Sequence, residues 1–286
     1  MSATTPSGPI TWHGFRTRSL PEVPGWIEPL GRAGYIAKGV VYGIIGFLAF
    51  QLAIGAGGEI AGAREAIREI GQQPFGRILL GLVAIGLFGY TAWRLVQAIK
   101  DTEGEGTDAK GVIKRIGYTI SGLAYLTLAF FAASIAIGSG GGGGQGQAGP
   151  LLDTMWGRVL LGIAGGITIG VAIAFVYKAI KAKFMEKYDL AAMDENKRKL
   201  ALYVGRIGLS TRAVAFAIIG GFIIMSAVRG TGDGDIAGIS DALAAIASQP
   251  YGKILIGITG LGLICFGIHQ IMMGLYRRFN VAGANH

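Results

Sequence analysis

The sequence predicts an all-α membrane protein with six transmembrane helices, arranged as three tandem two-helix repeats. The 286-residue chain is 51% hydrophobic and has a mean hydropathy of +0.51. Its apolar residues fall in six blocks of about 20 residues, the length that crosses a bilayer. The chain contains 50 glycines, mostly within these blocks, where small residues let helices approach closely. Similar motifs recur at the start of alternate blocks, which indicates the repeats.

Residues 1–30 are expected to form a cytoplasmic arm, either amphipathic or disordered. The arm is polar, contains five prolines and has no apolar leader segment, so the first membrane helix is expected to act as an uncleaved insertion signal. Trp12 and Trp26 suit the headgroup level of a bilayer and are interpreted as interface anchors. A disordered tail without specific contacts explains them equally well.

The first repeat, residues 31–100, is predicted to hold two membrane helices at about 35–55 and 76–99. Between them, residues 60–73 place isoleucines on one helical face and charges on the other. This piece is too short and too charged to span a bilayer. We expect it to lie flat on the outer surface or to dip between the helices.

The second repeat, residues 114–181, is predicted to have helices at about 116–137 and 157–180. The run at 139–149 is mostly glycine and offers no side chains for a core, so a flexible outer loop is expected. It lacks the GK[ST] ending of a phosphate-binding loop. This repeat also lacks the amphipathic piece, so a ring of repeats should be lopsided here.

The third repeat, residues 205–276, is predicted to have helices at about 206–228 and 252–275. A second amphipathic piece is expected at 241–249, and residues 277–286 form a cytoplasmic tail.

Three alignments within the chain support the repeats. In one, an aromatic residue stands ten positions beyond Arg32, Arg115 and Arg206: Tyr42, Tyr125 and Phe216. Gly31–Tyr35 (GRAGY) matches KRIGY and GRIGL at the starts of the other odd helices, and Gln73–Gly81 (QPFGRILLG) matches TMWGRVLLG and QPYGKILIG at the even helices. Since each repeat crosses twice, all three enter from the same side. The repeats are therefore parallel, and pseudo-threefold symmetry about the membrane normal is expected.

The net charge of +9 is explained by topology rather than by nucleic-acid binding. With both termini inside, 20 Lys and Arg residues lie on the cytoplasmic side and six on the outer side. Positive residues favour the cytoplasmic side of a membrane protein. The prediction is a multipass protein of the cell membrane in contact with membrane lipids, with both termini cytoplasmic and no nucleic-acid partner.

The stretch GYIAKGVVY at 34–42, the Pro-aromatic-Gly-basic helix starts and the threefold two-helix repeat carry a family resemblance. Over residues 31–274 the chain resembles an uncharacterised family of bacterial membrane proteins, a domain of unknown function that occurs three times per chain. The resemblance implies six membrane helices and the cell membrane. It implies no activity.

Charged residues within the membrane are the first functional candidates. Lys38 and Arg212 share one repeat position, where the second repeat has Ser121, about 9 Å deeper than Arg32 and Arg206 at 1.5 Å per residue. One interpretation is that both side chains snorkel to the cytoplasmic interface. The other is a basic cluster on the pseudo-axis that binds an anion or a lipid headgroup.

Two further sets of basic residues mark the helix ends. Arg32, Arg115 and Arg206 are interpreted as interface anchors. Arg77, Arg158 and Lys253 are candidates for binding lipid headgroups or the carbonyls at the ends of the preceding helices, with anchoring again the simpler interpretation. Close helix packing is predicted at six glycines: Gly39, Gly43, Gly46, Gly162, Gly166 and Gly170.

No catalytic constellation is visible in the sequence. The acidic residues fall outside the apolar blocks, so a carboxylate relay within the membrane is absent. His269 is interpreted as a packing residue, and neither a metal nor another cofactor is predicted. The first hypothesis is non-enzymatic binding or passage of a small anion or lipid. The second is an accessory or scaffold subunit of a larger membrane complex, or a homo-oligomer; an enzyme acting on lipid comes third.

Overall fold

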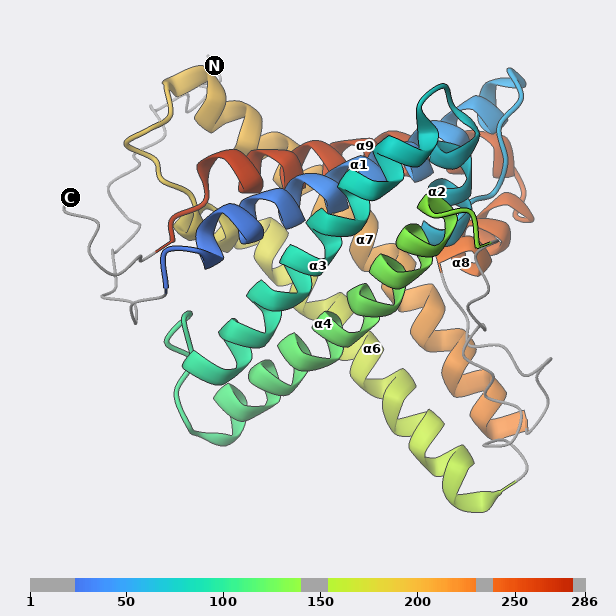
Figure 1. The fold of residues 1–286 in the computed structure, drawn as a ribbon. Helices are drawn as coiled ribbons and strands as arrows, with labels where there is room; N and C mark the ends of the chain where they lie inside the picture. Colours follow the sequence, from blue (N-terminus) through green and yellow to red (C-terminus); the bar gives the residue numbers. More distant parts are fainter. Residues whose placement is uncertain (1–23, 140–153, 230–238, 280–286) are drawn as a thin grey trace, which may run out of the picture.

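The computed structural model describes residues 24–139, 154–229 and 239–279, and this part of the chain is helical with short connections (Figure 1). Trp12 and most of the glycine-rich run lie outside the described residues. The helices are α1 (Ile27–Ile54), α2 (Ala63–Gln72), α3 (Gly76–Lys100), α4 (Ala109–Ala136), α6 (Met155–Lys181), η2 (Lys183–Lys187), α7 (Glu195–Arg229), α8 (Ile239–Ala247) and α9 (Gly252–Tyr276).

Six of these helices are long and apolar enough to cross a membrane: α1, α3, α4, α6, α7 and α9. The six-span prediction is therefore confirmed. The short helices α2 and α8 correspond to the two amphipathic pieces, and both bury their apolar face against the long helices.

The most extensive helix packing is between repeats rather than within them. The strongest pairs are α1 with α9, α3 with α4, and α6 with α7. Each pair joins the even helix of one repeat to the odd helix of the next, and α9 with α1 closes the cycle from the third repeat to the first. In Figure 1 the three pairs run in three different directions. The repeats thus form a closed ring of antiparallel helix pairs.

Glycines make the α1–α9 contact close. A Cβ atom on Gly39 would lie 2.7 Å from the carbonyl oxygen of Gly267, and one on Gly46 would lie 2.5 Å from that of Gly260. Gly43 is predicted to pack in the same way, but a Cβ atom on it would meet no heavy atom within 4 Å; only its backbone nitrogen lies against α9, 2.9 Å from a Cβ built on Gly267. Any side chain at Gly39 or Gly46 would push the two backbones apart.

The glycine stripe predicted on the fourth membrane helix does not pack in this way. A Cβ atom on Gly166 or Gly170 would meet no heavy atom within 4 Å, and one on Gly162 would make only an ordinary contact with α7. Instead, Gly165 packs on α7, where its Cβ would lie 3.0 Å from the carbonyl oxygen of Gly220. Because each residue turns the helix by about 100°, the neighbouring stripe faces elsewhere.

The three odd helices begin several residues earlier than the hydropathy pattern predicts. α4 starts at Ala109 rather than near residue 116, and the Asp108 side chain accepts a hydrogen bond from the Gly111 amide at 3.0 Å. α1 starts at Ile27 rather than near residue 35, because its first turns contain Glu28 and Arg32, which form an ion pair at 2.6 Å. α7 starts at Glu195 rather than near residue 206, and the Asp194 side chain accepts a hydrogen bond from the Lys197 amide at 2.9 Å. Charged first turns stabilise a helix without making it apolar.

The ring is asymmetric at the second repeat. α1 packs on α3 and α7 packs on α9, but α4 and α6 are not a packed pair. Half of the membrane-spanning window is buried in α1, α3 and α9, whereas 28% is buried in α4 and 11% in α6. The second repeat therefore has the most surface left for lipid or for a ligand.

Candidate functional site

Lys38 on α1 and Arg212 on α7 lie inside the helix bundle. Only 4% of Lys38 and 8% of Arg212 is exposed. The snorkelling interpretation required both side chains to reach the surface at the helix ends. The structure places neither of them there. It brings the two side chains into one aromatic site instead.

Lys38 is held by tyrosines from the neighbouring helices. Its Nζ donates a hydrogen bond to the hydroxyl of Tyr90 on α3 at 3.0 Å. The same nitrogen lies 4.7 Å from the Tyr90 ring centroid, 4.9 Å from that of Tyr125 on α4 and 5.7 Å from that of Phe266 on α9. Each ring offers its negative face to the ammonium group.

Arg212 is surrounded by four rings. Its Cζ lies 4.7 Å from the centroid of Phe266, 4.9 Å from Phe216, 5.0 Å from Tyr42 and 5.3 Å from Phe175. The Nε of Arg212 is buried and has no hydrogen-bond partner among the described residues. A donor thus remains available inside the site.

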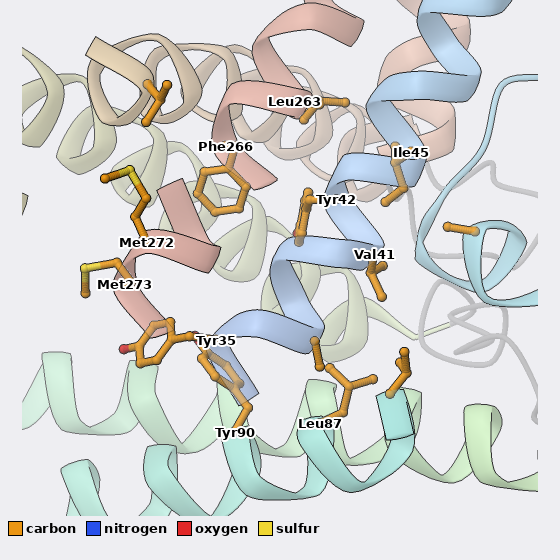
Figure 2. Close-up of a cluster of buried hydrophobic side chains, with 14 of the residues drawn as sticks. Tyr35, Val41, Tyr42, Ile45, Leu87, Tyr90, Leu263, Phe266, Met272 and Met273 are labelled. Atoms are coloured by element: carbon orange, nitrogen blue, oxygen red, sulfur yellow. The ribbon is translucent and has the colours of Figure 1, made fainter. Parts of the chain in front are cut away.

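All six membrane helices contribute to this arrangement, which we call the central basic site. Figure 2 shows two of its rings, Tyr42 from α1 and Phe266 from α9, approaching each other between their helices, with centroids 4.9 Å apart. The central basic site consists of Lys38, Arg212, Tyr42, Tyr90, Tyr125, Phe175, Phe216 and Phe266.

The site has positive charge without a matching carboxylate. Neither Lys38 nor Arg212 takes part in any ion pair among the described residues. Burying a charge without a partner is costly, and two like charges in one site also repel. Cation–π contacts offset only part of this, about 0.5–2 kcal/mol each. A bound anion is the chemical group that would complete the site.

A hydrogen-bonded chain connects the site with the loop between α3 and α4. Arg94 donates from Nε to the Tyr90 hydroxyl at 2.9 Å and from Nη1 to the Gln97 side-chain oxygen at 3.0 Å. Gln97 in turn donates to Glu103 at 2.6 Å. The chain fixes the orientation of Tyr90, which is the hydrogen-bond partner of Lys38.

Glu103 lies at the end of that chain, in the loop between α3 and α4, and joins the segments that follow each of the three repeats. It forms ion pairs with Lys187, at 2.7 Å, and with Arg277. Burial alone would raise the pKa of Glu103, but these two cations outweigh burial and hold the pKa well below its usual range. Glu103 is therefore an anion at neutral pH and ties together the segments that follow α3, α6 and α9.

The arginines at the helix ends bind backbone carbonyls. Arg115 donates to the carbonyl oxygens of Ala98 and Ile99, at the C-terminus of α3. Arg32 likewise donates to those of Gly274 at 3.0 Å and Leu275 at 2.8 Å, at the C-terminus of α9. These arginines occupy free carbonyls at the ends of helices.

At the opposite ends of the helices, the arginines lie on even helices and the carbonyls that they bind lie on odd helices. Arg77 donates to the carbonyl oxygen of Ala136 at 3.0 Å, and Arg158 to those of Ala227 at 3.2 Å and Val228 at 3.1 Å. The carbonyls belong to the odd helix of the following repeat, so the expected contact with the preceding helix is wrong. The remaining predicted positions, Lys253, Arg206 and Trp26, are exposed.

His269 is a buried, hydrogen-bonded residue of α9. Its Nδ1 lies 3.0 Å from the Tyr188 hydroxyl, which also donates to the His269 carbonyl oxygen at 3.2 Å. Among the described residues, no group of His, Cys, Asp or Glu side chains is arranged to hold a metal ion.

Sequence reasoning missed the aromatic half of the central basic site. Tyr42, Tyr125 and Phe216 share one repeat position, ten residues beyond Arg32, Arg115 and Arg206, and this register was the available signal. Tyr90 of α3 and Phe266 of α9 also share one repeat position, measured from Gly76 and Gly252, whereas Phe175 of α6 stands at another.

The fold and the site define a multipass membrane protein of three tandem two-helix repeats around a buried basic centre. The chain belongs to the family described as Domain of Unknown Function (DUF1206), whose profile matches residues 33–101, 116–182 and 207–277. It is 37% identical to "Uncharacterized protein YxxB" of Bacillus subtilis (strain 168) over 265 residues, which cover 92% of this chain and 96% of the relative. No solved structure matches the chain. The predicted family and its three repeats are confirmed.

Proposed function

We propose that this protein binds an anionic group at the central basic site, as a non-enzymatic step in holding or passing a small anion or an anionic lipid. The observation that carries the proposal is the burial of Lys38 and Arg212 together, without a carboxylate partner among the described residues. Buried charges within a membrane are expensive and mark functional sites.

The chemistry of the site favours a phosphate or carboxylate group. The planar guanidinium of Arg212 can donate two parallel hydrogen bonds to such a group, and the ammonium of Lys38 supplies a second charge. The surrounding rings exclude water, which strengthens both interactions.

The test uses purified protein in a neutral detergent, with melting temperature as the readout. The two probes are inorganic phosphate, at constant ionic strength, and phosphatidylglycerol, compared with phosphatidylcholine. A ligand that binds only the folded state raises the melting temperature. At a ligand concentration about one hundred times Kd, it increases the free energy of unfolding by about 2.7 kcal/mol. We expect at least one probe to stabilise the parent and the combined variant Lys38→Ala/Arg212→Ala to lose that stabilisation.

Arg206→Ala is the matched control, because Arg206 is an exposed arginine on α7, six residues before Arg212. It should leave the ligand-induced shift unchanged. If neither probe stabilises the parent, or if the double variant responds like the parent, the proposal is wrong. Flux of the same anion into proteoliposomes then separates passage from binding.

A scaffold role is the second candidate, favoured by the exposure of α6, of which only 11% of the membrane-spanning window is buried. A subunit interface would cover this helix. Affinity purification in mild detergent with an α6 variant such as Ile167→Arg tests it, because Ile167 is 59% exposed. A partner that the parent retains and the variant loses would support this role.

A further inference from the structure

The second repeat has an open hairpin where the other two repeats have a packed one. α1 packs on α3 and α7 packs on α9, whereas α4 and α6 are not a packed pair. In Figure 1 the outer ends of α4 and α6 lie far apart. The faces that would meet in this hairpin are therefore not covered by each other.

Equivalent glycines on the odd helices show the difference at atomic scale. A Cβ atom on Gly34 would lie 2.5 Å from the backbone nitrogen of Tyr90, and one on Gly208 would lie 2.5 Å from the Cα of Phe266. These contacts close the hairpins of the first and third repeats. A Cβ on the equivalent Gly117 of α4 would meet no heavy atom within 4 Å.

The even helices repeat the comparison. A Cβ atom on Gly89 of α3 would lie 3.0 Å from the carbonyl carbon of Leu30 on α1. A Cβ on the equivalent Gly170 of α6 would meet no heavy atom within 4 Å. Each helix of the second hairpin thus has a glycine, Gly117 or Gly170, at the position that packs closely in the first repeat, but a Cβ atom there would contact no described part of the protein.

The open hairpin lies beside the central basic site. The ring of Tyr125 on α4 covers Lys38 at 4.9 Å, and the ring of Phe175 on α6 covers Arg212 at 5.3 Å. Both rings are partly exposed, whereas Phe266, which contacts both cations from α9, is buried. Two rings from the open repeat therefore separate the cations from the space outside the bundle.

The exposed side chains of α4 and α6 are apolar, which suits acyl chains. A free anion would have to leave water to pass between these helices, whereas a lipid keeps its chains in the bilayer. The exposed residues include Ile116, Ile120 and Leu123 on α4, and Ile163, Ile167 and Ile173 on α6.

We infer that the ligand of the central basic site is an anionic phospholipid, which enters sideways from the bilayer between α4 and α6. The inference rests on the proposed function and specifies its ligand class and route. The lipid phosphate contacts Arg212, whose buried Nε has no partner among the described residues, and Lys38. The acyl chains remain between the apolar faces of the second repeat.

The cytoplasmic leaflet is the source that the geometry supports. Lys178, near the cytoplasmic end of α6, is exposed and lies 5.9 Å from the ring of Phe175, which in turn covers Arg212. Arg212 lies about 9 Å deeper along its helix than Arg206, at 1.5 Å per residue. A headgroup can therefore move from Lys178 past Phe175 to Arg212 without crossing the bilayer.

The experiment obstructs the opening without touching the cations. The variant Gly117→Trp/Gly170→Trp places two large side chains where no protein atom lies within 4 Å, so the ligand-free protein should melt as the parent does. Ile258→Trp is the control, since Ile258 on α9 is 63% exposed and belongs to neither helix of the opening. Apparent affinity for phosphatidylglycerol is measured by its effect on the melting temperature, with inorganic phosphate in parallel.

We expect the double tryptophan variant to bind phosphatidylglycerol about tenfold or more weakly, a difference of about 1.4 kcal/mol, and the Ile258→Trp control to bind it like the parent. If the double variant binds it like the parent while Lys38→Ala/Arg212→Ala does not, the route is wrong and the central basic site stands. If inorganic phosphate stabilises the parent as strongly as the lipid and the tryptophans weaken neither, the ligand is a free anion. If the ligands stabilise Lys38→Ala/Arg212→Ala as strongly as they stabilise the parent, the proposed function itself is wrong.

Photolabelling of the unmodified protein provides an independent measurement, which holds even where the tryptophan variant does not fold. A phosphatidylglycerol with a photoreactive group near the headgroup should label peptides that contain Tyr125 or Phe175. Labelling confined to other helices would overturn the lateral route.

Discussion

Buried charge is used in two different ways in this protein. In the loop after α3, Glu103 balances Lys187 and Arg277, so the charges in that cluster are paired. At the centre, Lys38 and Arg212 are balanced only by aromatic rings. The first arrangement stabilises the fold, and the second is the one that we propose binds a ligand.

Glu103→Gln should lower the melting temperature by about 5–10 °C at pH 7, because breaking a buried ion pair costs about 3–5 kcal/mol. The amide cannot neutralise Arg277, of which only 4% is exposed. The measurement is thermal unfolding in detergent, with Glu105→Gln as a control in the same loop, where Glu105 pairs with Lys114.

The effect of Glu103 also has a defined pH dependence. Since its pKa is held below the ordinary value, its contribution is complete above the unfolded pKa of about 4.3 and is lost as pH falls through the folded pKa. The difference in melting temperature between parent and Glu103→Gln should be constant from pH 7 to about pH 5 and shrink below about pH 4. A difference that shrinks between pH 7 and pH 5 would exclude this explanation.

At the scale of helices, packing between repeats depends on small residues at repeated positions. Gly46 and Gly260 form the α1–α9 crossing, and Gly220 and Gly165 form the equivalent α7–α6 crossing. In the α4–α3 pair the equivalent positions are alanines, Ala129 and Ala84, which are buried. The same contact is therefore made three times with slightly different residues.

Gly46→Ala should destabilise the protein by about 1–3 kcal/mol, the usual range for overpacking. Its Cβ would lie 2.5 Å from the carbonyl oxygen of Gly260 and 2.7 Å from the nitrogen of Ile264, both backbone atoms that cannot turn away. Gly166→Ala should be neutral or stabilising, because its Cβ meets nothing and alanine favours a helix. Melting temperatures of the two variants measure the difference; equal values would contradict this account of the crossing.

Sequence reasoning succeeded where one physical cause controls the outcome. Hydropathy and helix length predict six spans because a bilayer requires them. It failed where the outcome depends on which helices meet: the stripe of Gly166 and Gly170 has the right spacing for packing, yet only Gly165 faces α7. Likewise, Arg77 donates a hydrogen bond to the Ala136 carbonyl oxygen on α4, a helix of the next repeat. The sequence of one repeat does not show which helix of another repeat it will pack against.

At the scale of the whole molecule, the ring has a polarity. The three aromatic residues at the starts of the even helices, Phe75, Trp156 and Tyr251, lie at the outer end and are 80%, 80% and 81% exposed. Aromatic side chains at this level suit the interface between lipid and water. The opposite end carries the excess of Lys and Arg, so that end should face the cytoplasm.

This orientation predicts the result of labelling single cysteines in a Cys265→Ser background. Glu59, in the connection after α1, and Asn196, in the first turn of α7, are exposed and lie at opposite ends of the ring. A thiol reagent that cannot cross membranes should label Glu59→Cys in intact spheroplasts and Asn196→Cys only after permeabilisation. The reverse pattern would place the entrance beside Lys178 in the outer leaflet and would invert the charge asymmetry that orients membrane proteins. Labelling of both sites in intact spheroplasts would contradict the assignment of the two connections to opposite sides of the bilayer.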